Sequence, residues 1–358
     1  MSILGKRYFN SKRTTIKLTE TQEKAKLAIE KLIKDGTYQF ESVPCLCEVS
    51  SENDLILATR DRYGLKHQTV ICQNCGLIRT NPKLTQYSYN HFYENWYRQL
   101  YSGYAHVDEN GFRLEFESMQ PRGKKILEFL EKFHICLTEK TILEIGSGGG
   151  WNLLSFEQIG AKTIGFDYGS YIEFGRKLYG LDLRYGSIEE AVNESVRADI
   201  VILSHVIEHF TDPITTLKDI RKVLKYDGVC YLETPGILNI HNTYLDLMGL
   251  LQNAHTYTFS MITLSYFVKS AGYEVQYCDE FIRMLCKPLS TQHSSAFEVD
   301  LNHSTLVIKY LKDCEKKRLY RRFDKTLRSV IKRVIVAILN AMGLYNLSKD
   351  LYHKIKER

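Results

Sequence analysis

Short apolar runs rich in β-branched residues recur along the chain from residue 141 onward, with segments of helical spacing between them. The runs are TILEIG from 141, KTIGFD from 162, DIVILS from 199 and VCYLETP from 229. Continuous apolar runs of this length are typical of strands buried on both faces. Because each run is separated from the next by enough residues for a crossover helix, the pattern predicts an α/β fold with a doubly wound, mostly parallel sheet.

Other patterns lie outside this alternation. Apolar residues at near-helical spacing predict helices over 21–34, which Gly36 ends, and over 124–133. The segments YEVQY at 273–277 and STLVIKYLK at 304–312 are predicted to add a closing hairpin to the sheet. The chain is therefore expected to divide into an N-terminal helix and lead-in (1–40), a cysteine-bearing module (41–85), an aromatic helical lid or linker (86–135), the α/β domain (136–312) and a helical tail (313–358).

Charge is concentrated in the tail. The whole chain is 44% apolar and 25% charged, as in ordinary globular proteins, with a formal net charge of +6. Residues 314–358 hold thirteen Lys and Arg against four Asp and Glu, so the rest of the chain is slightly acidic. The tail is expected to form a basic amphipathic helix that contacts an anionic membrane surface, or that packs its apolar face against the protein or a partner.

The start of the chain does not resemble a signal peptide, because only three apolar residues in a row precede Lys6. The longest apolar stretch, 334–344, is too short to span a bilayer and contains Asn340 and Gly343. We therefore expect a cytoplasmic protein whose tail allows peripheral contact with the inner face of the membrane.

The first apolar run leads directly into a glycine-rich turn, Gly146 to Gly150. Such a turn lets the backbone approach a ligand closely and directs free amide groups at it. Asp167 ends the next predicted strand, where its carboxylate could accept hydrogen bonds from both ribose hydroxyls of a nucleoside. The dinucleotide fingerprint G-x-G-x-x-G fails in both registers, because Trp151 and Leu153 stand where its last glycine is needed.

The segment E-x-G-x-G-x-G, formed by Glu144, Gly146, Gly148 and Gly150, resembles the first motif of class I S-adenosylmethionine-dependent methyltransferases. The resemblance implies a seven-stranded Rossmann-like sheet, S-adenosylmethionine as the cofactor and methyl transfer as the activity. Ser187 stands where many relatives have Asp. The residues that the resemblance assigns to the cofactor are Glu144, Gly146, Ser147, Gly148, Gly150, Asp167, Tyr168, Ser187, Ile188 and Ser204.

His205, Glu208 and His209 follow the fourth apolar run. Alone, H-x-x-E-H is also the inverted zinc-protease signature, but here it follows a parallel strand beside a cofactor motif. It is similar to the E-x-x-E-H segment at the reaction centre of ubiquinone-biosynthesis O-methyltransferases, which implies catalytic positions for these residues. Three roles stay open: His209 as general base, a divalent ion at Glu208 and His209, or packing beside the cofactor. Acceptor-pocket candidates after the fifth strand are His241, His255 and Tyr257.

Four cysteines form a pair of pairs, Cys45 with Cys47 and Cys72 with Cys75. Four thiolates in two short knuckles suit a structural zinc ion, with loss of the metal as the alternative because C-x-C is unusual. Together with DRYGL at 61–65 and the aromatic segment 92–101, they resemble the N-terminal zinc ribbon of methyltransferases found with bacterial surface-polysaccharide and sugar-modifying enzymes. This second resemblance implies that Tyr97, Arg98 and Tyr101 belong to a helix that folds over the cofactor.

The expected activity is O-methylation of a sugar hydroxyl in a nucleotide-linked or lipid-linked glycan. Methylation of a quinone-like phenol, an amine or a sugar carbon is the alternative, as is a scaffold that keeps the fold without turnover. The expected partner is a small-molecule or glycan acceptor. Nucleic acid is not expected, because residues 41–85 have few clustered basic residues. The sequence does not indicate the oligomeric state.

Overall fold

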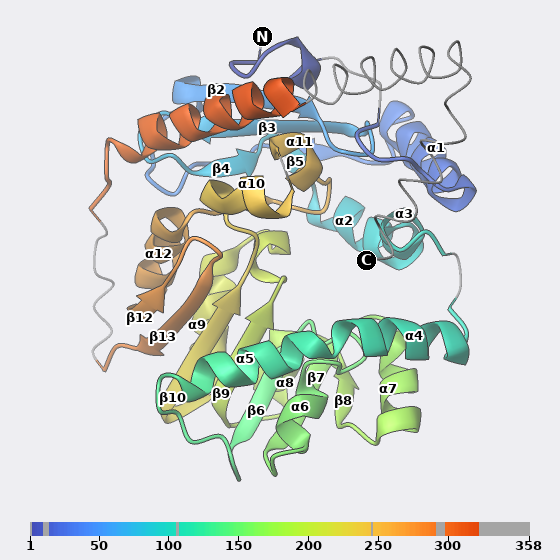
Figure 1. Ribbon diagram of the computed structural model, residues 1–358, viewed down its shortest axis with the longest axis vertical. Helices are drawn as coiled ribbons and strands as arrows, with labels where there is room; N and C mark the ends of the chain where they lie inside the picture. The colour runs from blue at the N-terminus through green and yellow to red at the C-terminus, as the bar shows by residue number, and fades with distance from the viewer. Residues whose placement is uncertain (1, 10–13, 105–106, 245, 291–297, 322–358) are drawn as a thin grey trace, which may run out of the picture. The chain divides into compact units, whose positions relative to one another are not determined.

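The structure is a computed structural model that describes residues 2–9, 14–104, 107–244, 246–290 and 298–321 (Figure 1). The chain divides into two units, Met1–Ile308 and Lys309–Arg358. Most of the predicted basic tail, 313–358, lies outside the described residues. Within the described part of the chain, no helix is both long and apolar enough to cross a membrane.

A seven-stranded sheet lies at the centre of the larger unit and confirms the predicted fold class. Its strands are β6 (Thr141–Ile145), β7 (Lys162–Asp167), β8 (Leu183–Tyr185), β9 (Ala198–Ser204), β10 (Leu224–Glu233), β12 (Tyr273–Cys278) and β13 (Arg283–Pro288). Their order is β12-β13-β10-β9-β6-β7-β8. Strands β6 to β10 pair in parallel, whereas β13 is antiparallel to both neighbours. The strand order reverses between β6 and β9, where open sheets bind ligands at the carboxyl ends of their strands.

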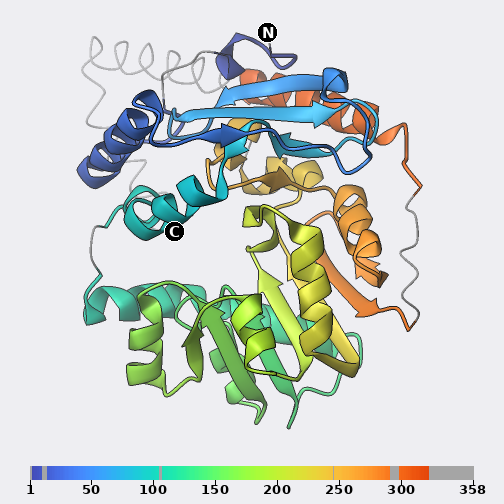
Figure 2. The same ribbon diagram turned by 180° about the vertical axis from the view of Figure 1, so that it is seen from behind.

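Two layers of helices cover the sheet. Buried residues from α4 (Glu109–Met119), α5 (Pro121–Glu131), α6 (Leu153–Glu157) and α7 (Tyr171–Tyr179) share one core cluster with Ile142 and Ile200. Residues from α8 (Ile188–Asn193), α9 (Pro213–Val223) and α12 (Met261–Ser270) share another with Leu143 and Val201. Successive strand residues point to opposite faces, so the clusters lie on opposite sides. Figure 1 shows α5 in front of the sheet, and Figure 2 shows the opposite side.

The cysteine-bearing module contains a second, antiparallel sheet in the order β11-β4-β3-β2. Three of its strands are consecutive: β2 (Asp54–Arg60), β3 (Lys66–Cys72) and β4 (Ile78–Thr80). The fourth, β11 (Tyr257–Thr258), comes from the segment that follows β10 and pairs with β4. A small pair, β1 (Phe40–Glu41) with β5 (Lys83–Leu84), accompanies this sheet. The segment that follows β10 therefore completes the sheet of the module.

The predicted N-terminal helix is α1 (Glu20–Lys34), which begins with a capping box between Thr19 and Gln22. The aromatic segment is two helices, α2 (Gln86–Asn95) and α3 (Tyr97–Tyr101), because Trp96 leaves the helical conformation with φ −126°. The remaining short elements are helices α10 (Ile240–Thr243) and α11 (Leu247–Leu250) and 3-10 turns at Lys6–Tyr8, Ser51–Asn53, Ile207–His209 and Ile237–Asn239.

One predicted strand is wrong. Residues 304–312 belong to a helix described over 303–321, and the strand that pairs with β12 is β13. The apolar positions Val307, Leu311 and Cys314 recur at the i, i+4, i+7 spacing of a helical face. The β-branched content of 304–312 suggested a strand, but the spacing favours a helix over its whole length.

Candidate active site

The glycine-rich turn lies at the carboxyl end of β6. Gly146 and Gly148 have φ of 73° and 56°, a left-handed conformation that glycine adopts without strain. A Cβ on Gly148 would lie 2.2 Å from the ring of Trp151, so a larger residue does not fit there. The turn is thus shaped by local backbone geometry for close approach to a ligand.

Asp167 ends β7 and faces this turn. Its carboxylate accepts hydrogen bonds from Gly148 N at 2.9 Å and Gly169 N at 2.6 Å. A carboxylate has about four lone-pair positions, so this one can still accept from ribose hydroxyls. The two backbone hydrogen bonds fix the carboxylate in the position that the sequence predicts for a nucleoside-binding acid.

Two buried polar atoms beneath the turn fit a bound ligand. Glu144 is 1% exposed; its Oε1 accepts a hydrogen bond from Asn152 at 2.7 Å. Neither Glu144 Oε2 nor the hydroxyl of Ser147 has a hydrogen-bond partner in the described part of the chain. Burial raises the pKa of Glu144 to about 8. Because unpaired buried polar atoms are costly, these residues suit a polar cofactor such as S-adenosylmethionine.

The residues predicted to contact adenine lie beside Asp167. Gly186 N donates to Asp167 O at 3.0 Å, which joins the end of β8 to the end of β7. The Tyr168 ring is 69% exposed, and the Ser187 hydroxyl donates to Glu189 at 2.7 Å. Ile188 is buried in the core. Tyr168 and Ser187 are therefore available at the surface of the site, whereas Ile188 serves mainly to anchor α8.

Tyr97 and Arg98 of α3 also lie at the carboxyl end of β7. Arg98 packs on the ring of Tyr171 with 3.6 Å between the guanidinium carbon and the ring centroid. A Cβ on Gly169 would lie 3.0 Å from both Arg98 Nη2 and Asp167 Oδ1. Arg98 Nη1 is buried and has no hydrogen-bond partner among the described residues. The structure thus brings the predicted lid cation next to the predicted ribose-binding carboxylate.

His205 follows β9 in a strained conformation, with φ 58°. Its N–H donates to Glu233 O at 2.7 Å, and its Nε2 lies 4.0 Å from Glu233 Oε1. Ser204, the last residue of β9, donates to Glu233 Oε2 at 3.3 Å. A left-handed histidine costs about 1–3 kcal/mol and persists only where its surroundings require it. Glu233 was not predicted; its position at the carboxyl end of the neighbouring strand is the signal that would have found it.

Glu208, His209 and His255 form a polar group, and ligand atoms of all three lie within 4.8 Å of one another. Neither oxygen of Glu208, which is 1% exposed, has a hydrogen-bond partner in the described residues. His205 Nδ1 lies 3.8 Å from Glu208 Oε1. The donor set of one carboxylate and two imidazoles could hold a divalent ion.

Burial controls the protonation of this group. It raises the pKa of Glu208 to about 8 and lowers that of His209 to about 4, with nearby His205 lowering the pKa of His209 further. Burial also moves the pKa of His255 well below its usual value. Both imidazoles are therefore neutral at pH 7, so each ring keeps one nitrogen that can accept a proton.

A row of tyrosines on α2 and α3 faces the histidines. Tyr93 Oη lies 3.0 Å from His209 Nδ1. The rings of Tyr93 and Tyr97 are 4.9 Å apart, and those of Tyr97 and Tyr101 are 4.5 Å apart. These ring contacts give the tyrosines one common face across the break at Trp96. The sequence singled out Tyr97 and Tyr101 but missed Tyr93, which the four-residue spacing of these tyrosines would have included.

The acceptor-pocket candidates differ in where they lie. His255 packs edge to face on His209, with ring centroids 4.8 Å apart. Tyr257 stacks on Phe259 within the hydrophobic core, so its contacts are structural. His241 lies on α10.

A cavity of about 330 Å³ is lined by His205 and Glu233, close to the lower limit of about 300 Å³ for small-molecule sites. The lining combines aromatic and apolar surface with hydroxyl, amide and cationic groups. Apolar surface comes from Ile126, Pro235, Tyr231, Tyr244 and Phe281, and polar groups come from Lys125, Thr234, Asn239, Thr243 and Arg283.

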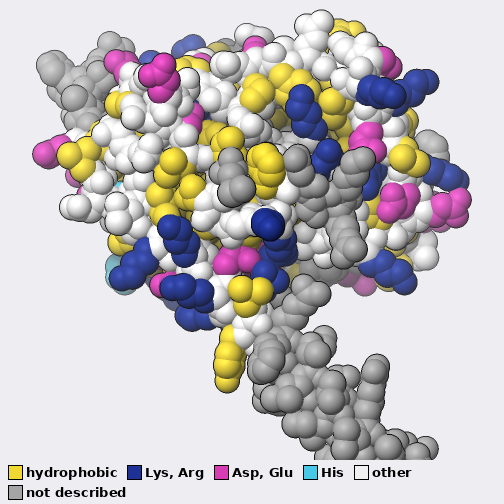
Figure 3. All heavy atoms as spheres, turned by 90° about the horizontal axis from the view of Figure 1, so that it is seen from above, with side chains coloured by type: hydrophobic (Ala, Val, Ile, Leu, Met, Phe, Trp, Pro, Cys, Tyr) yellow, Lys and Arg dark blue, Asp and Glu magenta, His cyan; other side chains and the backbone are white. Residues whose placement is uncertain are grey.

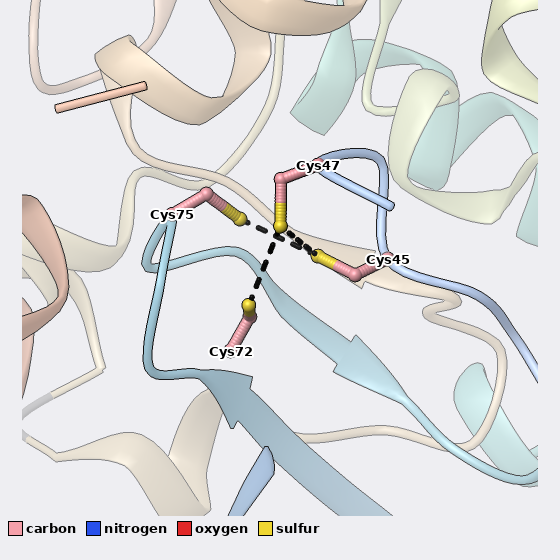
Figure 4. A group of neighbouring side chains, drawn as sticks. All are labelled: Cys45, Cys47, Cys72 and Cys75. Carbon is pink, nitrogen blue, oxygen red and sulfur yellow. Dashed lines mark hydrogen bonds between the residues drawn. The ribbon is translucent and has the colours of Figure 1, made fainter. Parts of the chain in front are cut away.

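The four cysteines of the module converge (Figure 4). Cys45 Sγ lies 3.4 Å from Cys75 Sγ, and Cys47 Sγ lies 3.5 Å from Cys45 Sγ and 3.6 Å from Cys72 Sγ. Zinc–sulfur bonds of about 2.3 Å in a tetrahedron place sulfurs about 3.8 Å apart. The sulfurs come from the loop after β1 and from the turn between β3 and β4, and their number, chemistry and spacing fit a structural zinc ion.

Comparison with known proteins places this geometry in a family. Residues 116–277 match a family model described as a methyltransferase domain. A tRNA U34 carboxymethyltransferase from Campylobacter jejuni is 28% identical over 157 residues, which cover 42% of this chain and 51% of that enzyme. A ubiquinone biosynthesis O-methyltransferase from Nitrosospira multiformis is 26% identical over 204 residues, 53% of this chain and 84% of that enzyme. The chain thus spans about half the length of the carboxymethyltransferases that it matches.

Solved structures with a similar arrangement include an O-methyltransferase family protein from Burkholderia thailandensis, with 16% identity, a TM-score of 0.40 and coverage of 57% of this chain and 71% of that one. The family match agrees with the strand order of the sheet and with the glycine turn and acidic residue at the ends of β6 and β7. Residues 116–277 are therefore similar to a methyltransferase domain in sequence and in the strand order of the sheet.

Proposed function

We propose that this protein transfers the methyl group of S-adenosylmethionine to a sugar hydroxyl in a nucleotide-linked or lipid-linked glycan. The observation that carries the proposal is the pairing of His209 with Tyr93 at the carboxyl end of β9, on the same side of the sheet as the cofactor turn. A neutral imidazole held by a phenol is suited to remove a proton from a hydroxyl.

Different residues bind the cofactor and accept the proton. Asp167 and the Gly146–Gly150 turn would hold the nucleoside part of the cofactor, and Tyr97 and Arg98 would cover it. S-adenosylmethionine supplies an electrophilic methyl group on a sulfonium. With the hydrogen of His209 on Nδ1 and donated to Tyr93, Nε2 accepts the proton that the acceptor hydroxyl loses as its oxygen bonds to the methyl carbon and the carbon–sulfur bond breaks. Positioning and exclusion of water supply most of the remaining rate enhancement.

The cavity beside His205 supports a sugar-like acceptor. Glu233, Asn239 and Thr243 offer hydrogen bonds to hydroxyl groups, and Tyr244 and Phe281 offer apolar surface for the face of a sugar ring. Lys125 adds positive charge that suits a phosphate group, whereas the guanidinium of Arg283 is paired with Asp279. On the face shown in Figure 3, basic side chains occur in separate groups with acidic ones between them, unlike the continuous basic stripe of a nucleic-acid surface.

The acceptor is tested with radiolabelled S-adenosylmethionine and four acceptor classes: sugar nucleotides, lipid-linked glycans, catechol-type phenols and tRNA. We expect transfer to one of the first two, with a mass gain of one methyl group on oxygen. Transfer to a phenol or to tRNA would replace the sugar proposal; the latter two classes are included because relatives are named as a ubiquinone biosynthesis O-methyltransferase and a tRNA U34 carboxymethyltransferase. If the protein binds the cofactor but transfers a methyl group to none of the four acceptor classes, the result would favour a scaffold without turnover.

Cofactor binding is tested separately by calorimetric titration of S-adenosylhomocysteine into the Asp167→Ala variant. The variant loses the acceptor of the ribose hydroxyls and the hydrogen bonds from Gly148 N in the turn and from Gly169 N after β7. Hydrogen bonds to charged groups are worth about 1.5–3 kcal/mol each, so we expect the dissociation constant to rise at least about tenfold. Asp182→Ala, which removes an exposed carboxylate paired with Arg184, is the matched control and should bind normally. Equal affinities for both variants would refute the assignment of Asp167.

A further inference from the structure

Residues 251–258, here called the bridging segment, connect the two sheets. The segment follows α11 and ends in β11, which adds to the sheet of the cysteine module. On its other side, Thr256 N donates to Glu208 O at 2.9 Å, next to His209. The bridging segment therefore contacts the cysteine module and the proton-accepting group at the same time.

The module binds the bridging segment through a continuous set of hydrogen bonds. Asp61, which is fully buried, accepts from Asn253 N at 3.1 Å, and Tyr101 Oη accepts from Ala254 N at 3.1 Å. Thr80 N donates to Thr256 O at 2.9 Å. Backbone groups of a loop are normally satisfied by solvent or by its own turns. Here the amides of Asn253 and Ala254 and the carbonyl of Thr256 are satisfied by Asp61 and Thr80 of the module and by Tyr101 of α3.

Thr80 is the point where this network reaches the histidines. It is 4% exposed, and its hydroxyl donates to His255 O at 2.7 Å. The same hydroxyl lies 3.2 Å from His67 Nε2, which can donate to it. Thr80 thus holds the backbone of His255, whose imidazole packs edge to face on His209 and pairs with Gln252 Nε2 at 2.7 Å within the bridging segment.

The cysteine cluster fixes the strand that carries Thr80. Strand β4 begins three residues after Cys75, and Cys72 N donates to Leu77 O at 3.0 Å within the same turn. Cys45, Cys72, Cys75 and Leu77 are all buried. Loss of a metal from this turn would therefore loosen β4 at its start, whereas the glycine turn and Asp167 are held by β6 and β7.

We infer that the metal-bound cysteine module positions the acceptor side of the active site, and that Thr80 is the positioning residue that fixes His255 against His209. The inference rests on the proposed function only in calling this side the acceptor side. In structural terms, we infer that the module keeps the bridging segment ordered. The cofactor turn is held by β6 and β7 and does not depend on the module.

The test is amide hydrogen exchange of the bridging segment in the full chain saturated with S-adenosylhomocysteine. Thr80→Val removes the hydroxyl without changing the shape of the side chain, and we expect about tenfold faster exchange at 252–257, from loss of about one hydrogen bond. Thr69→Val is the matched control: Thr69 is the cross-strand partner of Thr80, is 1% exposed, and its hydroxyl has no hydrogen-bond partner in the described residues. Thr80→Ser keeps the hydroxyl and should restore slow exchange.

Two further readouts separate positioning from general stability. The affinity for S-adenosylhomocysteine should stay within about threefold for Thr80→Val, while exchange of the bridging segment rises. Removal of the metal by a chelator should raise exchange of the same segment. Equal exchange in the Thr80→Val and Thr69→Val variants, or a loss of cofactor affinity as large as the rise in exchange, would overturn the inference. None of these measurements requires an acceptor, so failure to find methyl transfer leaves their result standing.

Discussion

Replacing Cys72 by serine is expected to release zinc and to lower the melting temperature of the whole chain. Cys72 is the last residue of β3 and 1% exposed, and its sulfur lies 3.6 Å from that of Cys47. Structural zinc contributes about 10–16 kcal/mol in zinc-finger peptides, as much as the whole stability of a typical domain, about 5–15 kcal/mol. We therefore expect the module to unfold without its metal.

The effect should extend beyond the module. Cys45, Cys72 and Cys75 belong to the same hydrophobic cluster as Leu203 of β9, so unfolding of the knuckles exposes part of the core of the methyltransferase domain. The measurements are zinc content by atomic absorption and thermal unfolding followed by circular dichroism.

Cys136→Ser is the control for the zinc experiment, because Cys136 is exposed and lies outside the cluster. It should keep one zinc ion per chain and the melting temperature of the unchanged protein. A Cys72→Ser variant that also kept both would show that the cluster does not depend on a metal.

The cofactor side of the site could be predicted because its signals are local. A buried strand, a glycine turn and an acid at the end of the next strand are all adjacent in sequence, and the sheet brings them together through parallel pairing of β6 with β7. The turn at 146–150 and the acid Asp167 therefore lie where the sequence placed them. Paired cysteines have the same advantage, since each knuckle is only a few residues long.

The acceptor side could not be predicted because its contacts join distant parts of the chain. Strand β11 has two residues, too few to show a period, and its partner β4 lies about 180 residues earlier. Tyr93 pairs with His209, which lies 116 residues later in the chain. The break between α2 and α3 occurs at Trp96, where neither proline nor glycine indicates it. The break therefore also depends on tertiary packing.

Replacing His209 by asparagine is expected to reduce the rate of methyl transfer by about 10²–10⁴-fold, the usual contribution of a general base. Asparagine is similar in size to part of the imidazole and can still donate a hydrogen bond to Tyr93, but it cannot take a proton at neutral pH. Binding of S-adenosylhomocysteine should not change, because His209 lies beyond the end of β9 and Asp167 at the end of β7. The measurement is single-turnover methyl transfer with the acceptor identified above.

His91→Asn is a matched control, because His91 Nδ1 is also paired with a tyrosine hydroxyl, Tyr38 Oη at 2.9 Å, outside the site. The His91→Asn variant should keep the full rate of methyl transfer. The comparison then distinguishes the loss of a general base from the loss of any tyrosine–histidine pair. A His209→Asn rate within about fivefold of the unchanged protein would exclude His209 as the base. A different outcome would indicate that Glu208, His209 and His255 hold a metal that activates the hydroxyl. In that case the rate of the unchanged protein falls with a chelator and returns with a divalent ion, while the cysteine cluster keeps its zinc.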